Sequence, residues 1–164
     1  MSDSGLHLPT PLSEEETIWQ ALRAIPDPEI PVLTIVDLGI IRDVREQEGH
    51  YEVVITPTYT GCPASHAIEL SIRTALDDAG FKDARISTQI APPWTTAWIS
   101  EEGRIKLKAY GIAPPKAETD TSPIACPQCG SQKTECISEH GSTACKALYR
   151  CLDCLEPFDY FKCI

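Results

Sequence analysis

Apolar residues recur at helical spacing in three parts of the first 112 residues. The clearest run extends from Ala64 to Ala79, where the apolar positions fall on one helical face. An earlier helix is expected to begin at Ser13, because Ser13 and Glu16 form a capping box, and to reach about Ala24. A third, short helix is expected from Ser100 to Gly111.

Strand-like patterns alternate with these helices. Ile40–Val44 and Tyr51–Thr56 are expected to pair across a polar hairpin loop, Glu46–His50, and Ala84–Ile90 alternates like a third strand. The order helix, strand, strand, helix, strand, helix predicts an α+β fold, with helices packed on a small mixed sheet.

The length of 164 residues suits one domain followed by a small module. We expect an α+β domain over residues 13–112, a proline-containing linker over 113–124, and a second module over 125–164. A net charge of −10 leaves no basic face for nucleic acid. The sequence has no signal-peptide pattern and no apolar run long enough to span a membrane, so a cytoplasmic protein is expected.

Cysteines concentrate at the end of the chain, where seven of the eight lie between Cys126 and Cys163. Without a secretion signal, such clustering favours metal binding over disulfides. Two C-x-x-C pairs stand out, and their four thiolates could surround one ion tetrahedrally: Cys126, Cys129, Cys151 and Cys154. The segment is too short to fold on its hydrophobic core alone, so we expect a zinc-ribbon β module that a structural zinc ion stabilises. The alternative is an iron-sulfur cluster, which four cysteines can also bind.

Three further cysteines remain in this module. Cys145 and Cys163 flank the second C-x-x-C pair, and Cys136 precedes both. Cys145 and Cys163 either form an accessory thiol pair or are packed, inert thiols.

Cys62 lies between the second predicted strand and the long predicted helix, with Pro63 expected at the first helical position. A thiol at a helix N-terminus tends to have a lowered pKa and to act as a nucleophile or metal ligand. The alternative is a small buried residue in a tight turn.

Asp27 and Glu29 project from a stretch with three prolines, Pro26 to Pro31, which cannot be helical. Their carboxylates either serve turn chemistry or form a rigid acidic edge beside a site.

Three stretches together resemble the MIP18 (DUF59) family: Asp27–Pro31, Asp37–Ile41 and Thr56–Ala64. The cysteine-rich end, from Gly141 to Cys163, is similar to the PaaD-type branch of that family, the accessory proteins of the phenylacetyl-CoA oxygenase (epoxidase) system. The resemblance implies that the family's reactive cysteine is Cys62 and that its acidic motif is Asp27 and Glu29, with Asp37 in the following turn.

The resemblance further implies a non-catalytic factor, with no catalytic residues, for iron-sulfur cluster assembly or delivery. Its partner would be the iron-sulfur reductase component of a di-iron oxygenase in aerobic phenylacetate catabolism. A transient cluster needs more ligands than Cys62. Either two chains meet as a homodimer, or Cys145 and Cys163 join, or the partner supplies ligands.

Two other functions compete with this interpretation. Cys62 could be the nucleophile of a thiol enzyme, with His66 one helical turn later as its base. Alternatively, the chain could be a structural zinc-ribbon docking subunit of the oxygenase complex.

Overall fold

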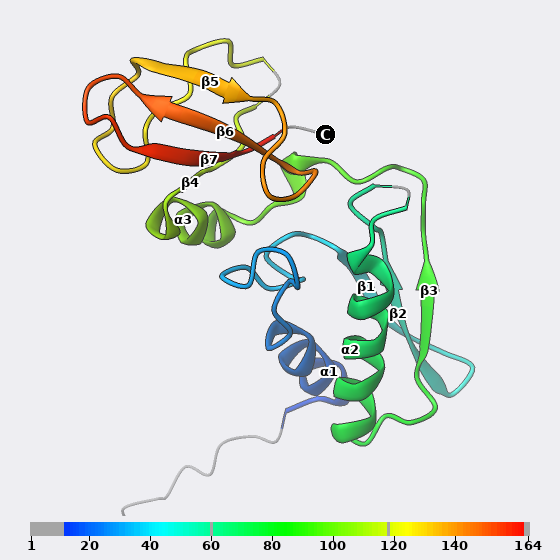
Figure 1. The fold of residues 1–164 in the computed structure, drawn as a ribbon. Helices are drawn as coiled ribbons and strands as arrows, with labels where there is room; N and C mark the ends of the chain where they lie inside the picture. The colour runs from blue at the N-terminus through cyan, green and yellow to red at the C-terminus, as the bar shows by residue number, and fades with distance from the viewer. Residues whose placement is uncertain (1–11, 60, 118, 163–164) are drawn as a thin grey trace, which may run out of the picture.

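The computed structural model of the chain describes residues 12–59, 61–117 and 119–162 (Figure 1). The first helix, α1, spans Glu14–Arg23 and begins as its capping box predicts. The Ser13 Oγ accepts a hydrogen bond of 3.2 Å from the backbone N–H of Glu16. The buried side chains of α1 include Ile18 and Leu22, so its apolar face points into the core.

A three-stranded mixed sheet forms the centre of the first module. Strand β1 (Ile41–Gln47) pairs antiparallel with β2 (His50–Ile55), and β2 pairs parallel with β3 (Arg85–Thr88). The β1–β2 loop is shorter than the five-residue loop expected from the sequence. It consists of Glu48 and Gly49, both with positive φ, as a tight two-residue hairpin of type I′ requires.

Helix α2 (Ala64–Asp78) connects β2 to β3, which makes a β-α-β unit. It begins one residue later than expected, because Pro63 is the N-cap and not the first helical residue. Helices α1 and α2 contact each other and lie against the sheet (Figure 1). The order of elements and the mixed sheet confirm the predicted α+β fold.

After β3 the chain passes through a short 3-10 helix (η1, Thr96–Trp98) to α3 (Glu101–Tyr110), which Ser100 caps and Gly111 ends. It then enters the second module as β4 (Ile112–Ala113). The first residue of the expected linker, Ala113, therefore belongs to a strand, because β4 pairs parallel with β7 (Pro157–Phe161).

The second module is a four-stranded sheet of order β4-β7-β6-β5. Strands β5 (Thr134–Ser138) and β6 (Lys146–Cys151) pair antiparallel, as do β6 and β7. This antiparallel ribbon lies above α3 in Figure 1 and has a small core of its own, formed by Ala113, Cys126, Cys151 and Phe158.

The two modules share part of their core. Phe161 of β7 and Cys145, just before β6, are buried in the large cluster of the first module and not in the small cluster of the ribbon. The Phe161 ring packs against Trp94, with ring centroids 6.4 Å apart. The ribbon is thereby fixed against the first module. Within the described residues, no helix has the length and apolar character needed to cross a bilayer.

Candidate functional site

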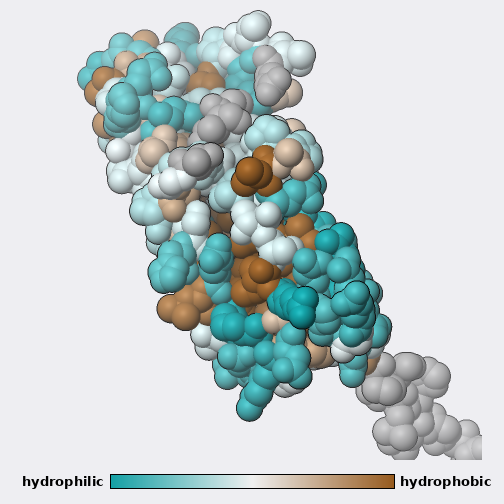
Figure 2. Space-filling model, turned by 90° about the vertical axis from the view of Figure 1, so that its right-hand side faces the viewer, coloured by the Kyte–Doolittle hydropathy of each residue, from teal (hydrophilic) through white to brown (hydrophobic). Residues whose placement is uncertain are grey.

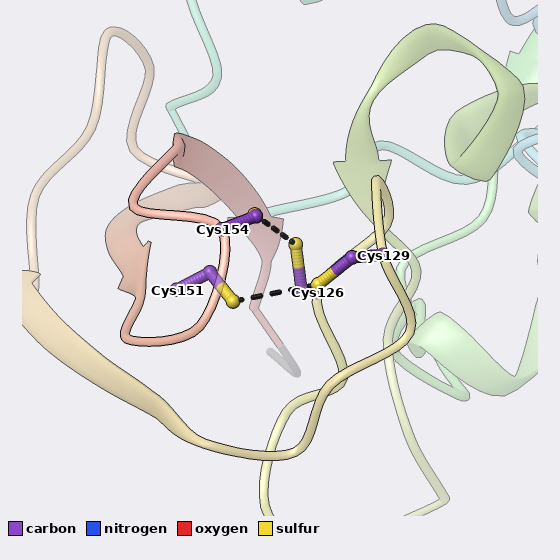
Figure 3. Close-up of side chains that lie close together, drawn as sticks. All are labelled: Cys126, Cys129, Cys151 and Cys154. Carbon is purple, nitrogen blue, oxygen red and sulfur yellow. Dashed lines mark hydrogen bonds between the residues drawn. The ribbon is translucent and has the colours of Figure 1, made fainter.

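The C-terminal ribbon brings four cysteine sulfurs together (Figure 3). The Sγ atoms of Cys126 and Cys154 are 3.7 Å apart, and those of Cys129 and Cys151 are 3.6 Å apart. A tetrahedral zinc ion with Zn–S bonds of about 2.3 Å would hold its sulfurs about 3.8 Å apart. The four thiols are therefore positioned to bind a metal ion with this geometry.

Backbone groups of the second knuckle favour the thiolate form of Cys151. The N–H of Cys154, followed by that of Asp153, outweighs burial and lowers the pKa of the Cys151 thiol to about 6. In the first knuckle, Gly130 follows Cys129 with φ +76°, and its N–H donates to the carbonyl of Cys126 at 2.9 Å. Each tight turn thus presents its sulfurs to the same point.

A second cluster of functional groups surrounds a cavity where the ribbon meets the first module. Its acidic and thiol lining residues come from four separate parts of the chain: Asp27, Glu29, Cys62, Glu69 and Cys145. The cavity has a volume of about 60 Å³. Pockets for organic ligands are typically about 300–1,000 Å³, so this cavity suits an ion or a small inorganic group. Apolar side chains also come to the surface in the middle of the face drawn in Figure 2, with hydrophilic residues around them.

Cys62 reaches the cavity from the turn between β2 and α2. Its N–H donates to the Tyr59 carbonyl at 3.2 Å, and its carbonyl accepts from the Ser65 N–H at 3.1 Å. Gly61 precedes it with φ +84°, a conformation that L side chains rarely adopt. Only 9% of Cys62 is exposed, so its thiol is accessible through the cavity rather than from open solvent.

Cys145 enters the same cavity from the ribbon. Its Sγ lies 3.9 Å from Oε2 of Glu29 and 3.0 Å from Oγ1 of Thr143. Burial and the nearby carboxylates of Glu29 and Asp27 outweigh the Thr143 hydrogen bond and raise the pKa of the Cys145 thiol. The thiol therefore holds its proton more firmly than an exposed cysteine does.

Asp27 both stabilises the turn that contains it and contributes a carboxyl group to the cavity, the two roles considered for it from the sequence. Its Oδ1 accepts hydrogen bonds from the N–H groups of Glu29 at 3.0 Å and Ile30 at 2.7 Å, which is turn chemistry. Asp27 also lines the cavity. Burial raises the pKa of its carboxyl, against the opposing effect of these two hydrogen bonds.

The wall of this cavity is mostly apolar, but its charged residues are all acidic, and its described lining residues include no lysine or arginine. The pKa of the Tyr59 hydroxyl is affected by the same acidic groups. Burial, a hydrogen bond with Cys62 and the charges of Cys62, Glu29 and Cys145 raise the pKa of its hydroxyl to about 12. Buried acids without a positive partner favour their neutral forms, and a bound cation would relieve that cost. The cavity is therefore chemically suited to a cation or a positively charged metal cluster.

Asp37, which the resemblance grouped with Asp27 and Glu29, lies elsewhere. Its Oδ2 accepts from the Thr34 N–H and from Lys106 Nζ, each at 2.9 Å, and its Oδ1 contacts Ser100 Oγ at 3.3 Å. These contacts tie the Thr34–Asp37 turn to the start of α3. Burial opposes ionisation, but Lys106 and Thr34 together lower the pKa of the Asp37 carboxyl. Its position indicates a structural role.

The other cysteine and histidine predictions have different outcomes. His66 is exposed on α2 and is not among the cavity's lining residues, and its role as the base of a thiol enzyme stays a prediction. Cys136 is exposed on β5, away from the cavity, with its Sγ 3.8 Å from Glu139 Oε1. Cys163 lies outside the described residues, so its pairing with Cys145 stays a prediction.

Two residues of the site were missed by sequence reasoning. Glu69 lines the cavity from α2, and Tyr59 forms the turn that holds Cys62. A signal for Glu69 was present, because Ser65 and Glu69 are one helical turn apart on the face that continues from Cys62. The position of Tyr59 depends on the turn geometry, which the sequence pattern does not specify.

Comparisons with known proteins agree with this two-module architecture. The family described as "PaaD zinc beta ribbon domain" matches residues 112–162, and the family described as "Iron-sulfur cluster assembly protein" matches residues 15–87. A protein from Escherichia coli (strain K12), named as a putative subunit of 1,2-phenylacetyl-CoA epoxidase, is 49% identical over 151 residues, which cover 90% of this chain and 92% of that protein.

Two other relatives match a shorter part of this chain. The "Fe-S protein maturation auxiliary factor" of Porphyromonas gingivalis (strain ATCC BAA-308 / W83) is 36% identical over 58% of this chain and 92% of its own length. A crystal structure of a DUF59 domain from Bacillus anthracis has a TM-score of 0.52 and 27% identity, and it covers 57% of this chain and 90% of that one. The chain belongs to the PaaD-type branch of the MIP18 (DUF59) family, in which an iron-sulfur cluster assembly domain is followed by a zinc β ribbon.

Proposed function

We propose that this chain is a non-catalytic maturation factor that carries an iron-sulfur cluster, or its components, as cargo at Cys62. The observation that supports this function best is the composition of the cavity. Thiols from Cys62 and Cys145 and carboxyl groups from Asp27 and Glu29 line one small space whose lining includes no lysine or arginine among the described residues. Thiolate is the ligand that binds iron-sulfur clusters, and nearby carboxylates stabilise added positive charge.

The recipient in this proposal is the iron-sulfur reductase component of a di-iron oxygenase that acts on phenylacetyl-CoA. Its support comes from the name of the Escherichia coli relative, a putative subunit of a phenylacetyl-CoA epoxidase, together with the relatives named as iron-sulfur maturation factors. The small volume of this cavity argues against binding of the organic thioester at Cys62.

The ribbon metal in this proposal is a structural zinc ion held by Cys126, Cys129, Cys151 and Cys154. The sulfur separations of 3.6 and 3.7 Å fit that ion. When bound, zinc supplies folding free energy to a module with a small core of its own. It fixes the strands that lead to Cys145 and Phe161, and so stabilises the cavity indirectly.

The experiment compares the reductase produced alone with the reductase produced together with this chain. We expect reductase purified after co-expression to contain its full iron and acid-labile sulfide and to show cluster absorbance in the visible range. Reductase produced alone should be largely without cluster. Equal loading in both samples would show that the chain is not needed for maturation and would favour a structural docking subunit.

A further inference from the structure

We propose that the ribbon supplies the second thiol ligand of the cargo, so that Cys62 and Cys145 of one chain bind a two-iron, two-sulfide cluster between the two modules. This inference rests on the proposed function and specifies the ligands of the same site. It makes the ribbon a part of the cluster site and not only a docking module.

Cys145 is buried at the boundary between the two modules. Cys145 is 7% exposed and belongs to the core cluster of the first module, although it precedes β6 of the ribbon. Its carbonyl accepts a hydrogen bond of 2.9 Å from the N–H of Lys162, and its Sγ contacts Thr143 Oγ1. The thiol is thereby held at the boundary between the modules, on the wall of the cavity that Cys62 also lines.

The thiol of Cys145 makes a contact across that boundary. Cys145 Sγ of the ribbon lies 3.9 Å from Glu29 Oε2 of the first module. Glu29, Cys62 and Cys145 line the same cavity, so the thiols of both modules face one space. A cation placed among them would interact with both thiolates and with the Glu29 carboxylate.

The separation of the groups indicates the class of cargo. Among residues 12–59, 61–117 and 119–162, only the four ribbon cysteines bring three or more candidate ligand atoms within 4.8 Å of one another. The cavity groups are thus too dispersed to close around one ion. A binuclear cluster has two irons bridged by sulfides, so its outer ligands lie farther apart than those of a single ion.

Binding as proposed is a ligand exchange without electron transfer. Each thiol releases its proton to solvent as its sulfur forms a bond to iron, and the oxidation states of iron and sulfide do not change. Two thiolates with weaker carboxylate ligands hold a cluster less firmly than the four cysteines of a typical [2Fe–2S] protein. Transfer to such an acceptor is therefore favourable.

The test uses the full chain with its ribbon loaded with zinc, reconstituted under argon with ferric iron and sulfide. We compare the wild type with Cys62→Ser, Cys145→Ser and Cys145→Ala. Cys136→Ser is the matched control, because Cys136 is an exposed ribbon thiol away from the cavity. The measurements are iron, sulfide and zinc per chain, visible absorbance and molecular mass by light scattering.

We expect about two irons and two sulfides per monomer in the wild type and in Cys136→Ser. Loss of either cavity thiol should reduce cluster affinity by about tenfold or more, while zinc stays at about one per chain. Full cluster binding by both Cys145 variants, or a cluster held only by a dimer, would overturn the inference.

A wild-type chain that binds no cluster would also overturn it. None of these results alone would decide the proposed function. The reductase experiment tests that function separately, because it compares reductase made with and without the wild-type chain and uses no Cys145 variant.

Discussion

The thiol of Cys145 lies 3.9 Å from the carboxylate of Glu29, a residue 116 positions earlier in the chain. The contact joins the proline-rich loop of the first module to the start of β6 in the ribbon. The sequence boundary between the two modules therefore does not divide the candidate site. Substitutions in either module should therefore alter the geometry of the cavity.

Removal of a ribbon ligand should release the metal and unfold the ribbon. We expect Cys126→Ser to lose the zinc ion, because metal binding and ribbon folding are one equilibrium. Elemental analysis and circular dichroism measure the two effects together. Cys136→Ser is the control, since Cys136 is exposed and lies outside the four-cysteine group. A Cys126→Ser chain with unchanged metal content would contradict the predicted ligand set.

The contact between Phe161 and Trp94 should couple ribbon packing to the first module. Phe161 is 2% exposed, and its truncation in Phe161→Ala should cost about 3–5 kcal/mol of stability. It should also change the fluorescence of Trp94, whose ring it contacts. Phe158→Ala is the matched control, because Phe158 is also buried but packs in the ribbon's own core. Equal effects of both variants on tryptophan emission would argue against a fixed arrangement of the modules.

Asp37 should stabilise the fold at neutral pH and lose this effect in acid. Its folded-state pKa lies below the ordinary value of 3.8, so its contribution is present above that value and is lost as the pH falls through the folded pKa. We expect Asp37→Asn to cost about 1–3 kcal/mol at pH 7, because the hydrogen bonds to a charged group are weakened. The difference from wild type should shrink below about pH 4 in urea unfolding curves.

The contribution of Asp27 to stability should depend on pH in the direction opposite to that of Asp37. Burial raises its folded-state pKa, so its contribution is present at low pH and is lost as the pH rises through that pKa. Asp27→Asn should therefore compare more favourably with wild type at pH 7 than in acid. Parallel pH dependences for the two variants would contradict the assigned directions.

Replacement of Gly39 by any other residue should destabilise the fold more than replacement of Gly49, because a side chain at Gly39 would clash with Trp98. It has φ +71°, and a Cβ there would lie 2.6 Å from the Trp98 carbonyl oxygen. Gly49, with φ +80°, has nothing within 4 Å of such a Cβ. Gly49→Ala should cost about 1–2 kcal/mol for the left-handed backbone alone. Gly39→Ala should cost about 1–3 kcal/mol more in thermal unfolding, from overpacking. Equal costs would show that the Trp98 contact relaxes freely.

Local sequence signals predicted the elements of the fold well where they were strong. The capping box at Ser13, the apolar face of α2 and the glycine after α3 each mark an element that the structure contains. The two C-x-x-C pairs likewise predicted the four-cysteine group, because such spacing makes a tight turn that directs both sulfurs to one point.

Features that depend on tertiary packing were not accessible from local patterns. Asp37 is close to Asp27 in sequence, yet its carboxylate turns to Lys106 of α3, whose proximity no local signal indicates. The approach of Cys145 to Glu29 depends on the parallel pairing of β4 with β7, which docks the ribbon against the first module. The length of the β1–β2 loop depended on positive φ values at Glu48 and Gly49, which the sequence pattern left unresolved.

In the proposed function, Cys62 binds the cluster that is destined for the reductase. The most direct test is to co-express the reductase with Cys62→Ser, with the wild-type chain, or with Cys136→Ser, and to measure iron and visible absorbance in the purified reductase. Serine is small enough to preserve the turn but does not supply the soft thiolate that iron-sulfur clusters require. We predict a reductase largely without cluster beside Cys62→Ser and full loading beside the other two. Full loading beside a stably folded Cys62→Ser chain would contradict the claim.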